Sequence, residues 1–442
     1  MRKKSMFPYP YIIEAMDQHF GIQSFLPPKK KSKLRGRYVN TRPPMMLKKR
    51  RLSILIATFW DYPHMGGLSN YITALSEGLR KLGHKVDIIS PNQFPVNEVK
   101  TMRTEVVPEL KSFFHTRYGS YNSTIVKNQR HMYVYEMMLK NINLQKYDVF
   151  HPQDLFTANI LGRINEVYRK PLLFTPHGMF TFNRVRFGIF QKGSLEELYY
   201  KTLECKAIEF ANHLIILSDS FRDPLMQLGA KQEKMTTVLT GINYPEKYGT
   251  KNTSTQKELV ITCVARLGPR KGHKVLFDAL SKMEKKYTDN MKVLIAGDGE
   301  MRDALEKQVA SLGLSMVEFL GERDDVPNIL SETDIFVLPT LNDSLPISII
   351  EAMHSGSCVI STISGGIPEL VHHEQTGILL EPGDVNKLVD ALKLVIENED
   401  ERKRLGENAR AFAKEHLTRE TMIAHIEKIY KKCLSEGGFY VS

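Results

Sequence analysis

Short apolar runs alternate with amphipathic stretches along most of the chain, and this alternation predicts a parallel β/α architecture. Residues 52–58 (LSILIAT) form a β-branched apolar run of the kind found in buried parallel strands. A glycine turn and a stretch of helical periodicity follow, and a second apolar run occupies residues 84–90. Such a β-α-β unit places helices on the faces of a parallel sheet. Residues 101–146 are less regular. Further strands are expected at 147–151, 171–175 and 213–218.

A second alternating series begins near Glu258, after a polar stretch at 242–256 that contains Pro245 and resembles a linker. Its expected strands are 258–265, 291–296, 317–320, 335–338 and 358–361. The fold class predicted is therefore α/β, with two Rossmann-like, doubly wound domains facing a cleft. Ligands of such sheets bind at the carboxyl ends of the strands.

Residues 1–50 have a different composition from the rest of the chain. Of the 61 Lys and Arg residues, 14 lie within residues 1–51, where Glu14 and Asp17 are the only acids, so the remainder is nearly neutral. Proline pairs and dense like charge predict a basic, partly flexible extension with one short helix near 11–20. A flexible solvated tail, an anionic membrane or an acidic partner each fits such an extension. Nucleic-acid binding is not expected, because the excess charge is confined to this extension.

The cysteines and the hydropathy pattern bear on the compartment. The four cysteines are far apart, without a Cys-x-x-Cys pair, which fits a reducing cytoplasm. No run of 18 apolar residues and no signal peptide is recognisable. The sequence predicts a cytoplasmic protein, with peripheral attachment to the inner membrane face as an option.

Several short motifs stand where expected strands end. Gly66-Gly67 and Gly297-Asp298-Gly299 would let a backbone approach a ligand, although ordinary tight turns are an equally good interpretation. Arg266 and Lys271 follow the first strand of the second series. Fixed cations there can stabilise a diphosphate leaving group as its charge develops, and the alternative is a pair of solvated surface charges.

The segment 338–357 (LPTLNDSLPISIIEAMHSGS) is the most informative. Asp343 lies in a loop, Pro346 opens an apolar helix, and Glu351 follows eight residues after Asp343. Both carboxylates can then reach one ligand. A carboxylate near a helix N-terminus is also favoured by the helix dipole, which explains Glu351 alone but not the combination.

These motifs, in this order, resemble those of the family-4 retaining glycosyltransferases of the GT-B fold. Ser364-Gly365-Gly366-Ile367-Pro368-Glu369 completes the series. The resemblance covers roughly residues 52–434. It implies an N-terminal acceptor domain at 51–243, a C-terminal nucleotide-sugar domain at 244–417, and a last helix at about 418–434 that returns to the first domain.

The resemblance implies a role for each matching residue. Arg266 and Lys271 would hold the donor diphosphate, Asp343 the donor sugar, and Glu351 the ribose hydroxyls. His177 matches a histidine beside the reacting centre. The catalytic residues expected are thus His177, Arg266, Lys271 and Asp343. The donor-binding residues expected are Gly66, Gly67, Gly297, Asp298, Gly299, Ser344, Leu345, Pro346, Ile347 and Glu351.

One residue departs from the family's pattern, and one acidic motif is absent. The family's paired motif usually begins with Glu, and Asp343 keeps the charge while shortening the reach, which suggests a changed donor sugar or weakened catalysis. No Asp-x-Asp pair occurs in the sequence. We therefore expect no cofactor and no catalytic metal, with a nucleotide-diphosphate sugar as substrate.

The acceptor is expected to be a glycan, a lipid or a small molecule with a hydroxyl group. Residues 179–201 mix aromatic and basic side chains and could face a lipid or a polyanionic glycan, although a helix pair with a basic outer side is the simpler interpretation. Two rival functions stay open. One is a sugar-nucleotide epimerase or hydrolase, and the other is a catalytically weakened scaffold or coat-type protein that binds partners through its basic arm.

Overall fold

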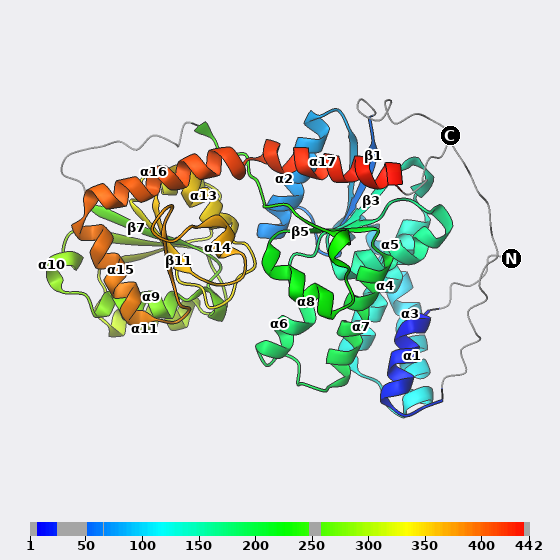
Figure 1. The fold of residues 1–442 in the computed structure, drawn as a ribbon. Helices are drawn as coiled ribbons and strands as arrows, with labels where there is room; N and C mark the ends of the chain where they lie inside the picture. The colour runs from blue at the N-terminus through cyan, green and yellow to red at the C-terminus, as the bar shows by residue number, and fades with distance from the viewer. Residues whose placement is uncertain (1–6, 24–50, 65, 247–257, 437–442) are drawn as a thin grey trace. The chain divides into compact units, whose positions relative to one another are not determined.

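The computed structural model describes residues 7–23, 51–64, 66–246 and 258–436, which separate into two compact units. The first unit combines Met1–Ile216, Phe221–Thr237 and His425–Ser442, and the second combines Leu217–Ser220 and Val238–Ala424. Each unit has helices packed on parallel β-sheet, so the predicted α/β class with two Rossmann-like domains is confirmed (Figure 1).

The first unit contains two three-stranded parallel sheets, ordered β2-β1-β3 and β4-β5-β6. A parallel bridge between Phe150 and Leu172 joins β3 to β4. Its strands are β1 (Ser53–Ala57), β2 (Lys85–Ile89), β3 (Val149–Pro152), β4 (Leu173–Phe174), β5 (His213–Ile216) and β6 (Met235–Thr237). The β-branched run at 52–58 thus forms the central strand of its sheet, where Ile54, Leu55 and Ile56 are fully buried.

Helices cover these strands. They are α1 (Pro10–His19), α2 (Gly67–Lys81), α3 (Val96–Tyr118), α4 (Ser123–Lys140), α5 (Leu155–Tyr168), α6 (Phe180–Arg186), α7 (Leu195–Phe210) and α8 (Arg222–Gln227). The irregular stretch at 101–146 is mostly the hairpin of α3 and α4. The apolar pattern of α3 was hard to detect because only Val106, Leu110 and Phe114 are buried among its 23 residues.

The second unit contains a six-stranded, all-parallel sheet in the order β12-β11-β10-β7-β8-β9. Figure 1 shows α13 and α16 on one side of this sheet and α9 and α11 on the other. The strands are β7 (Leu259–Val264), β8 (Met291–Ala296), β9 (Val317–Gly321), β10 (Ile335–Leu338), β11 (Cys358–Thr362) and β12 (Ile378–Leu380). The helices are α9 (His273–Ser281), α10 (Lys285–Thr288), α11 (Arg302–Ser311), α12 (Val326–Ser331), α13 (Ile347–Ser355), α14 (Ile367–Leu370), α15 (Val385–Glu397) and α16 (Glu399–His416). The last helix, α17 (Arg419–Glu436), begins in this unit, and its residues from His425 onward belong to the first unit.

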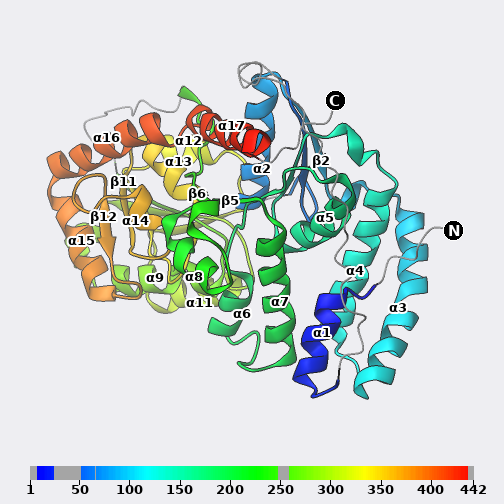
Figure 2. The same cartoon turned by 45° about the vertical axis from the view of Figure 1, so that its right-hand side comes forward.

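The expected N-terminal helix is present as α1, and it packs against α7 in the first unit (Figure 2). The hydroxyl of Tyr9 donates to Glu136 over 2.6 Å, and the guanidinium of Arg163 lies 4.3 Å from the centre of the Tyr9 ring. Asp17 is fully buried, and Arg117 donates to it from Nε and from a terminal nitrogen at 2.6 and 2.5 Å. This helix is therefore held by both apolar and ionic contacts.

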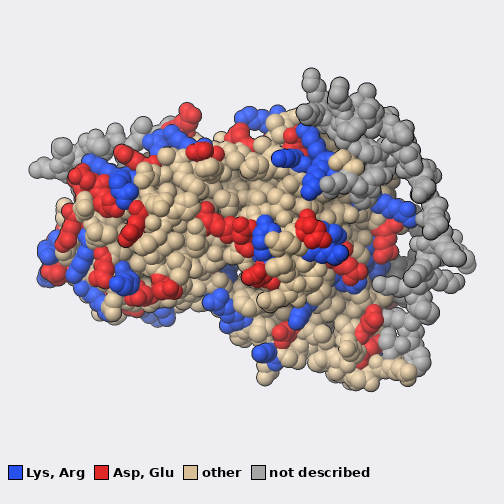
Figure 3. All heavy atoms as spheres, in the orientation of Figure 1, with Lys and Arg blue, Asp and Glu red and all other residues tan. Residues whose placement is uncertain are grey.

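The remaining expectations for residues 1–50, and for most of the linker at 242–256, lie outside the described residues. Within the described part, Cys263, Cys358 and Cys433 are buried free thiols, whereas Cys205 is partly exposed. None of the helices in that part combines the length and the apolarity needed to cross a bilayer. On the face drawn in Figure 3, acidic and basic side chains are intermixed, in line with the nearly neutral sequence after residue 51.

Arg117→Leu should destabilise the first unit, because it leaves the carboxylate of Asp17 buried without its cation. Breaking a buried pair in this way costs about 3–5 kcal/mol. Lys146→Leu is the matched control, since Lys146 and Asp87 form a pair whose side chains are 50% and 51% exposed. Such pairs contribute at most about 1 kcal/mol. Denaturant unfolding, together with amide exchange in residues 10–19, measures the difference, and equal losses in the two variants would contradict this account.

Candidate functional site

Four loops of the second unit follow neighbouring strands of its sheet. The strands β11, β10, β7 and β8 are adjacent and parallel, so their carboxyl ends lie along one edge. The loop after β7 carries Arg266 and Lys271, and the loop after β8 carries residues 297–299. Asp343 follows β10, and residues 364–369 follow β11. The sheet therefore gathers the predicted motifs of this unit at the edge where ligands of doubly wound sheets bind.

At two points the backbone of one of these loops directly contacts the backbone of the next. A Cβ on Gly297, which has φ +137°, would lie 2.0 Å from the carbonyl oxygen of Ala265. A Cβ on Gly272, at φ +76°, would lie 1.8 Å from the carbonyl oxygen of Pro339. These distances exclude any side chain at either position. The glycines thus allow the loops after β7, β8 and β10 to lie directly against one another.

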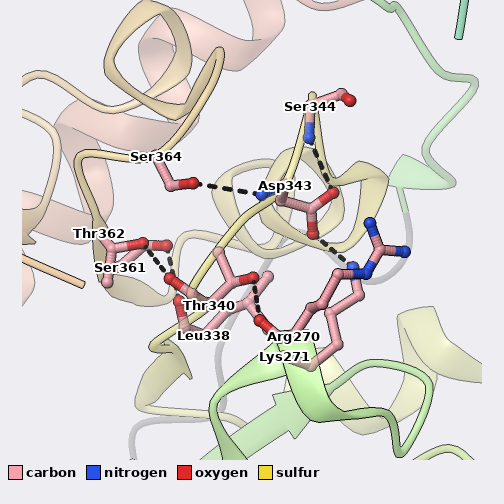
Figure 4. Close-up of polar contacts among 9 residues, drawn as sticks. All are labelled: Arg270, Lys271, Leu338, Thr340, Asp343, Ser344, Ser361, Thr362 and Ser364. Carbon is pink, nitrogen blue, oxygen red and sulfur yellow. Dashed lines mark hydrogen bonds and ion pairs between the residues drawn. The ribbon is translucent and has the colours of Figure 1, made fainter. Parts of the chain in front are cut away.

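Lys271 and Asp343 form an ion pair between the loops after β7 and β10, and both side chains are about one-fifth exposed, at 23% and 17% (Figure 4). The amide of Ser344 donates to Asp343 Oδ1 at 3.0 Å, and the amide of Asp343 donates to Ser364 Oγ at 3.2 Å. Figure 4 also shows the guanidinium of Arg270 beside the ammonium of Lys271. The structure thus brings together the predicted cation and the predicted sugar-binding carboxylate.

Arg266 and Asp298 are more exposed than this pair. The Arg266 side chain is 75% exposed and lies 3.1 Å from a carboxylate oxygen of Glu300. Asp298 accepts a 2.7 Å hydrogen bond from the amide of Gly299 and lies 3.6 Å from Arg302. Exposed ion pairs of this kind are weak, so Arg266 can exchange Glu300 for another anion at little cost.

The helix α13 begins at Ile347, after the buried Leu345 and Pro346, and no side chain caps its N-terminus. Uncapped amides at a helix N-terminus form a site for anionic oxygens. Glu351 lies one turn further along and is partly buried. Burial raises the pKa of its carboxyl group to about 7, and among the described residues no hydrogen bond reaches this carboxyl. A partly buried carboxyl group that receives no hydrogen bond from the described residues is suited to bind ligand hydroxyls.

In the first unit, the structure brings His177 close to the helix that follows the glycine turn. Gly66 precedes α2, and Gly67 is its first residue. The ring of Tyr71, also on α2, meets the ring of His177 edge-on at 4.8 Å. Burial lowers the pKa of His177 to about 3, so the imidazole is neutral at physiological pH.

Gln153 sets the tautomer of His177. The amide nitrogen of Gln153 donates to the backbone carbonyl of His151 at 3.2 Å, which turns its Oε1 toward His177 Nε2, 3.1 Å away. Nε2 must therefore carry the proton and Nδ1 is left as an acceptor. Next to it, the buried His151 contacts the hydroxyls of Tyr430 and Thr175 at 2.6 and 2.8 Å.

The sequence analysis did not find Gln153, His151 or Arg270 as parts of these surroundings. Gln153 and His151 lie at the end of an expected strand, which was a usable signal. The partner of His151, Tyr430, is 279 residues away in the sequence, and no local pattern connects the two. Among the described residues, no three His, Cys, Asp or Glu side chains are grouped so that they could hold a metal ion.

Two family descriptions match consecutive parts of the chain. Residues 65–244 match Glycosyltransferase Family 4, and residues 246–412 match Glycosyl transferases group 1. The chain belongs to the family-4 glycosyltransferases of the GT-B fold. Membership identifies it as a glycosyltransferase enzyme and favours this function over the scaffold and epimerase alternatives.

Relatives of this glycosyltransferase span almost all of its length. An uncharacterised glycosyltransferase of Methanocaldococcus jannaschii is 25% identical over 86% of this chain and 98% of its own. A Campylobacter jejuni N-acetylgalactosaminyltransferase that acts on an undecaprenol-diphosphate-linked glycan is 26% identical over 87% of this chain and 98% of its own. Among solved structures, Anabaena HepE in complex with UDP has a TM-score of 0.64 at 18% identity, covering 86% of this chain and all of that one.

Glu351→Gln should stabilise the ligand-free glycosyltransferase at pH 8 but not at pH 4.5. The folded pKa of about 7 lies above the ordinary value of 4.5, so the folded carboxyl retains a proton that the unfolded chain loses between these values. Stability is therefore lost as the pH rises through this window and stays lost above it, by at most about 3 kcal/mol. The melting temperatures of both proteins across this pH range measure the effect. A variant that is less stable than the wild type at pH 8 would show that Glu351 has a structural role.

Proposed function

We propose that this glycosyltransferase moves a sugar from a nucleotide-diphosphate donor to a hydroxyl acceptor, with retention of the anomeric configuration and without a metal ion. The observation that carries the proposal lies in the second unit. Lys271 and Asp343 meet at the carboxyl edge of the sheet, and Asp343 lies in the loop that leads into the uncapped helix bearing Glu351. A cation for phosphate, an acceptor for sugar hydroxyls and an acceptor for ribose hydroxyls are thus present together.

The ion pair between Lys271 and Asp343 would be exchanged when the donor binds. The ammonium would turn to the diphosphate, and the carboxylate would turn to the donor sugar. Arg266 would leave Glu300 and contribute a second positive charge to the diphosphate. Because these cations are fixed near the leaving group, they stabilise its developing charge more in the transition state than in the ground state.

The other site residues would complete the donor site. Glu351 would accept hydrogen bonds from the ribose hydroxyls, and the backbone amides of Ser344, Leu345 and Ile347 at the start of α13 would face the phosphates, with Pro346 opening the helix. Residues Gly297, Asp298 and Gly299, together with Gly66 and Gly67, would border the nucleotide and its phosphates. His177 would lie at the reacting centre as a neutral imidazole.

The names of related proteins support this choice of substrates. HepE has been crystallised with UDP and with UDP-glucose. The relative from Escherichia coli is named as a UDP-galactose transferase that acts on N-acetylglucosamine linked to undecaprenol through a diphosphate, and it is 29% identical over 63% of this chain. We propose a nucleotide-sugar donor and a glycan- or lipid-linked acceptor on this basis. A lipid-linked acceptor would place the enzyme at a membrane surface, with the basic residues 1–50 as an additional contact.

Lys271→Ala should lower the turnover of the donor by roughly 100- to 1,000-fold, as for other preorganised groups that stabilise charge. Lys274→Ala is the matched control, because its exposed side chain lies three residues away on α9. UDP binding by calorimetry and release of nucleotide from a panel of sugar nucleotides measure the donor site before the acceptor is known. Wild-type release of nucleotide by the Lys271 variant would remove this residue from the mechanism.

Removal of divalent metal should leave the activity unchanged, since Arg266 and Lys271 supply the charge for the diphosphate. The measurement is nucleotide release before and after dialysis against EDTA, with Mg²⁺ and Mn²⁺ restored in separate samples. A loss of activity on dialysis that either metal reverses would contradict metal independence, while the donor assignment would be tested separately by UDP binding.

A further inference from the structure

Three cations and one histidine gather on the α3–α4 hairpin of the first unit. Lys127, Arg130 and His131 lie on α4, and Arg103 lies on α3. A terminal nitrogen of Arg130 lies 2.7 Å from Nε2 of His131. Burial, followed by the charges of Arg130, Arg103 and Lys127, lowers the pKa of His131 to about 4. We name these four residues the α4 basic cluster.

The α4 basic cluster has no counter-charge in the part of the chain that the structure describes. Neither Arg103 nor Lys127 nor Arg130 forms an ion pair there, and Arg130 Nε is buried without a hydrogen-bond partner. Two of the three acids of α3, Glu105 and Glu109, lie instead close to Tyr133, where burial and then the charges of these two acids raise the pKa of its hydroxyl. A guanidinium has five N–H donors, and only one bond of Arg130 is satisfied, by His131.

His131 is ready to donate to the same ligand. Because its imidazole is neutral, Nε2 accepts the hydrogen bond from Arg130, and Nδ1 carries the remaining proton. Like charges that lie close together repel one another, and an anion that binds between them relieves this repulsion. The cluster therefore has the donors and the positive potential for a group with two or more anionic oxygens.

The cluster lies at the carboxyl edge of the first sheet. The ring of His131 is 6.4 Å from that of Phe59, which follows β1, and the Tyr135 hydroxyl donates to the carbonyl of Ile89 at the end of β2. The exposed Trp60, the single tryptophan of the chain, also contacts the Phe59 ring. An indole at this edge could stack on a sugar ring while the cations hold a nearby anion.

A cavity at the opposite edge of the same sheet provides a contrast. It has a volume of about 670 Å³ and is lined by the amino ends of β1 and β2, with several basic residues among its walls. There, however, Lys146 pairs with Asp87 at 2.8 Å, and Arg80 donates to the carbonyl of Val86 at 2.8 Å. At that edge Lys146 and Arg80 thus already have partners within the protein, whereas Arg103 and Lys127 of the α4 basic cluster form no ion pair among the described residues.

We propose that the α4 basic cluster binds a phosphate or diphosphate ester of the acceptor, with Arg130 as the principal contact. That the ligand is an acceptor rests on the proposed function, in which the first unit is the acceptor domain. Arg130 and His131 donate to the phosphoryl oxygens, and Arg103 and Lys127 add long-range attraction. The acceptor is then an anionic molecule, either a soluble phosphate ester or a lipid-linked phosphate.

The test is a titration of the full-length protein with glycerol 3-phosphate by calorimetry, without UDP and then with saturating UDP to occupy the donor site. Wild-type protein should bind the ester under both conditions and should not bind glycerol. Arg130→Gln should weaken binding roughly 10- to 100-fold, the usual effect of losing a charge-assisted hydrogen bond. Lys100→Gln is the matched control, because it removes an exposed cation of α3 outside the cluster and should change the affinity less than about twofold.

Stability gives a second, independent readout. Without ligand, Arg130→Gln should melt at the same temperature as the wild type or higher, because it removes a desolvated charge that has no counter-ion. A structural role of Arg130 would produce the opposite shift. Lower stability together with unchanged binding of glycerol 3-phosphate would overturn the proposal, and so would the absence of ester binding in the wild type.

Two further experiments distinguish a soluble phosphate ester from a lipid-linked one, and a failure of the anion site from a failure of the donor site. Phosphatidylcholine vesicles that contain phosphatidic acid replace the soluble ester, and binding to them that depends on Arg130 supports a lipid-linked acceptor. Dependence on Arg130 with the soluble ester alone supports a soluble acceptor. If UDP does not bind but the ester does, the proposed function fails while the anion site stands. If UDP binds and neither phosphate probe does, the anion site fails alone.

Discussion

No side chain fits where the loops at the carboxyl edge of the second sheet pass each other. The carbonyl oxygens of Ala265 and Pro339 occupy the space that a Cβ on Gly297 or Gly272 would need. This backbone contact fixes how far the loops after β7, β8 and β10 extend, and so determines where Lys271 meets Asp343. The ion pair, the start of α13 and the position of Glu351 all depend on that spacing. The chemistry of the donor site therefore rests on a steric constraint of the main chain.

Much of the fold could be predicted from local pattern. The strand β10 is buried on both faces, so it is a continuous apolar run with the same boundaries in sequence and structure. The strands β6 and β12 were missed because three residues are too few for a pattern. The helices α3 and α4 were missed for a different reason. The helix α3 buries few side chains, and the buried face of α4 includes the polar residues Asn128, Gln129 and Glu136, so neither sequence has a clear apolar stripe.

The candidate site was predictable only where its residues lie close together in sequence or follow strand ends. Asp343 and Glu351 share one loop and helix, and their spacing was readable. The contact between Lys271 and Asp343 joins residues 72 positions apart, and it depends on the strand order β10-β7, which a single sequence does not specify. Likewise, Arg103 and Arg130 come together only because α3 and α4 fold back on each other. Long-range polar contacts are thus the part of the site that local pattern cannot supply.

The hydrogen bond between Tyr430 and His151 has a consequence for how the protein is made. The first unit includes residues from both ends of the chain, and its buried His151 finds its hydroxyl partner on α17, after the whole second unit has been synthesised. Domains generally fold as units while the chain emerges from the ribosome. Until α17 has been synthesised, Nδ1 of this imidazole lacks its tyrosine partner, and the surface that receives α17 is uncovered. The last contacts of the first unit therefore form only after every strand of the second unit has been synthesised.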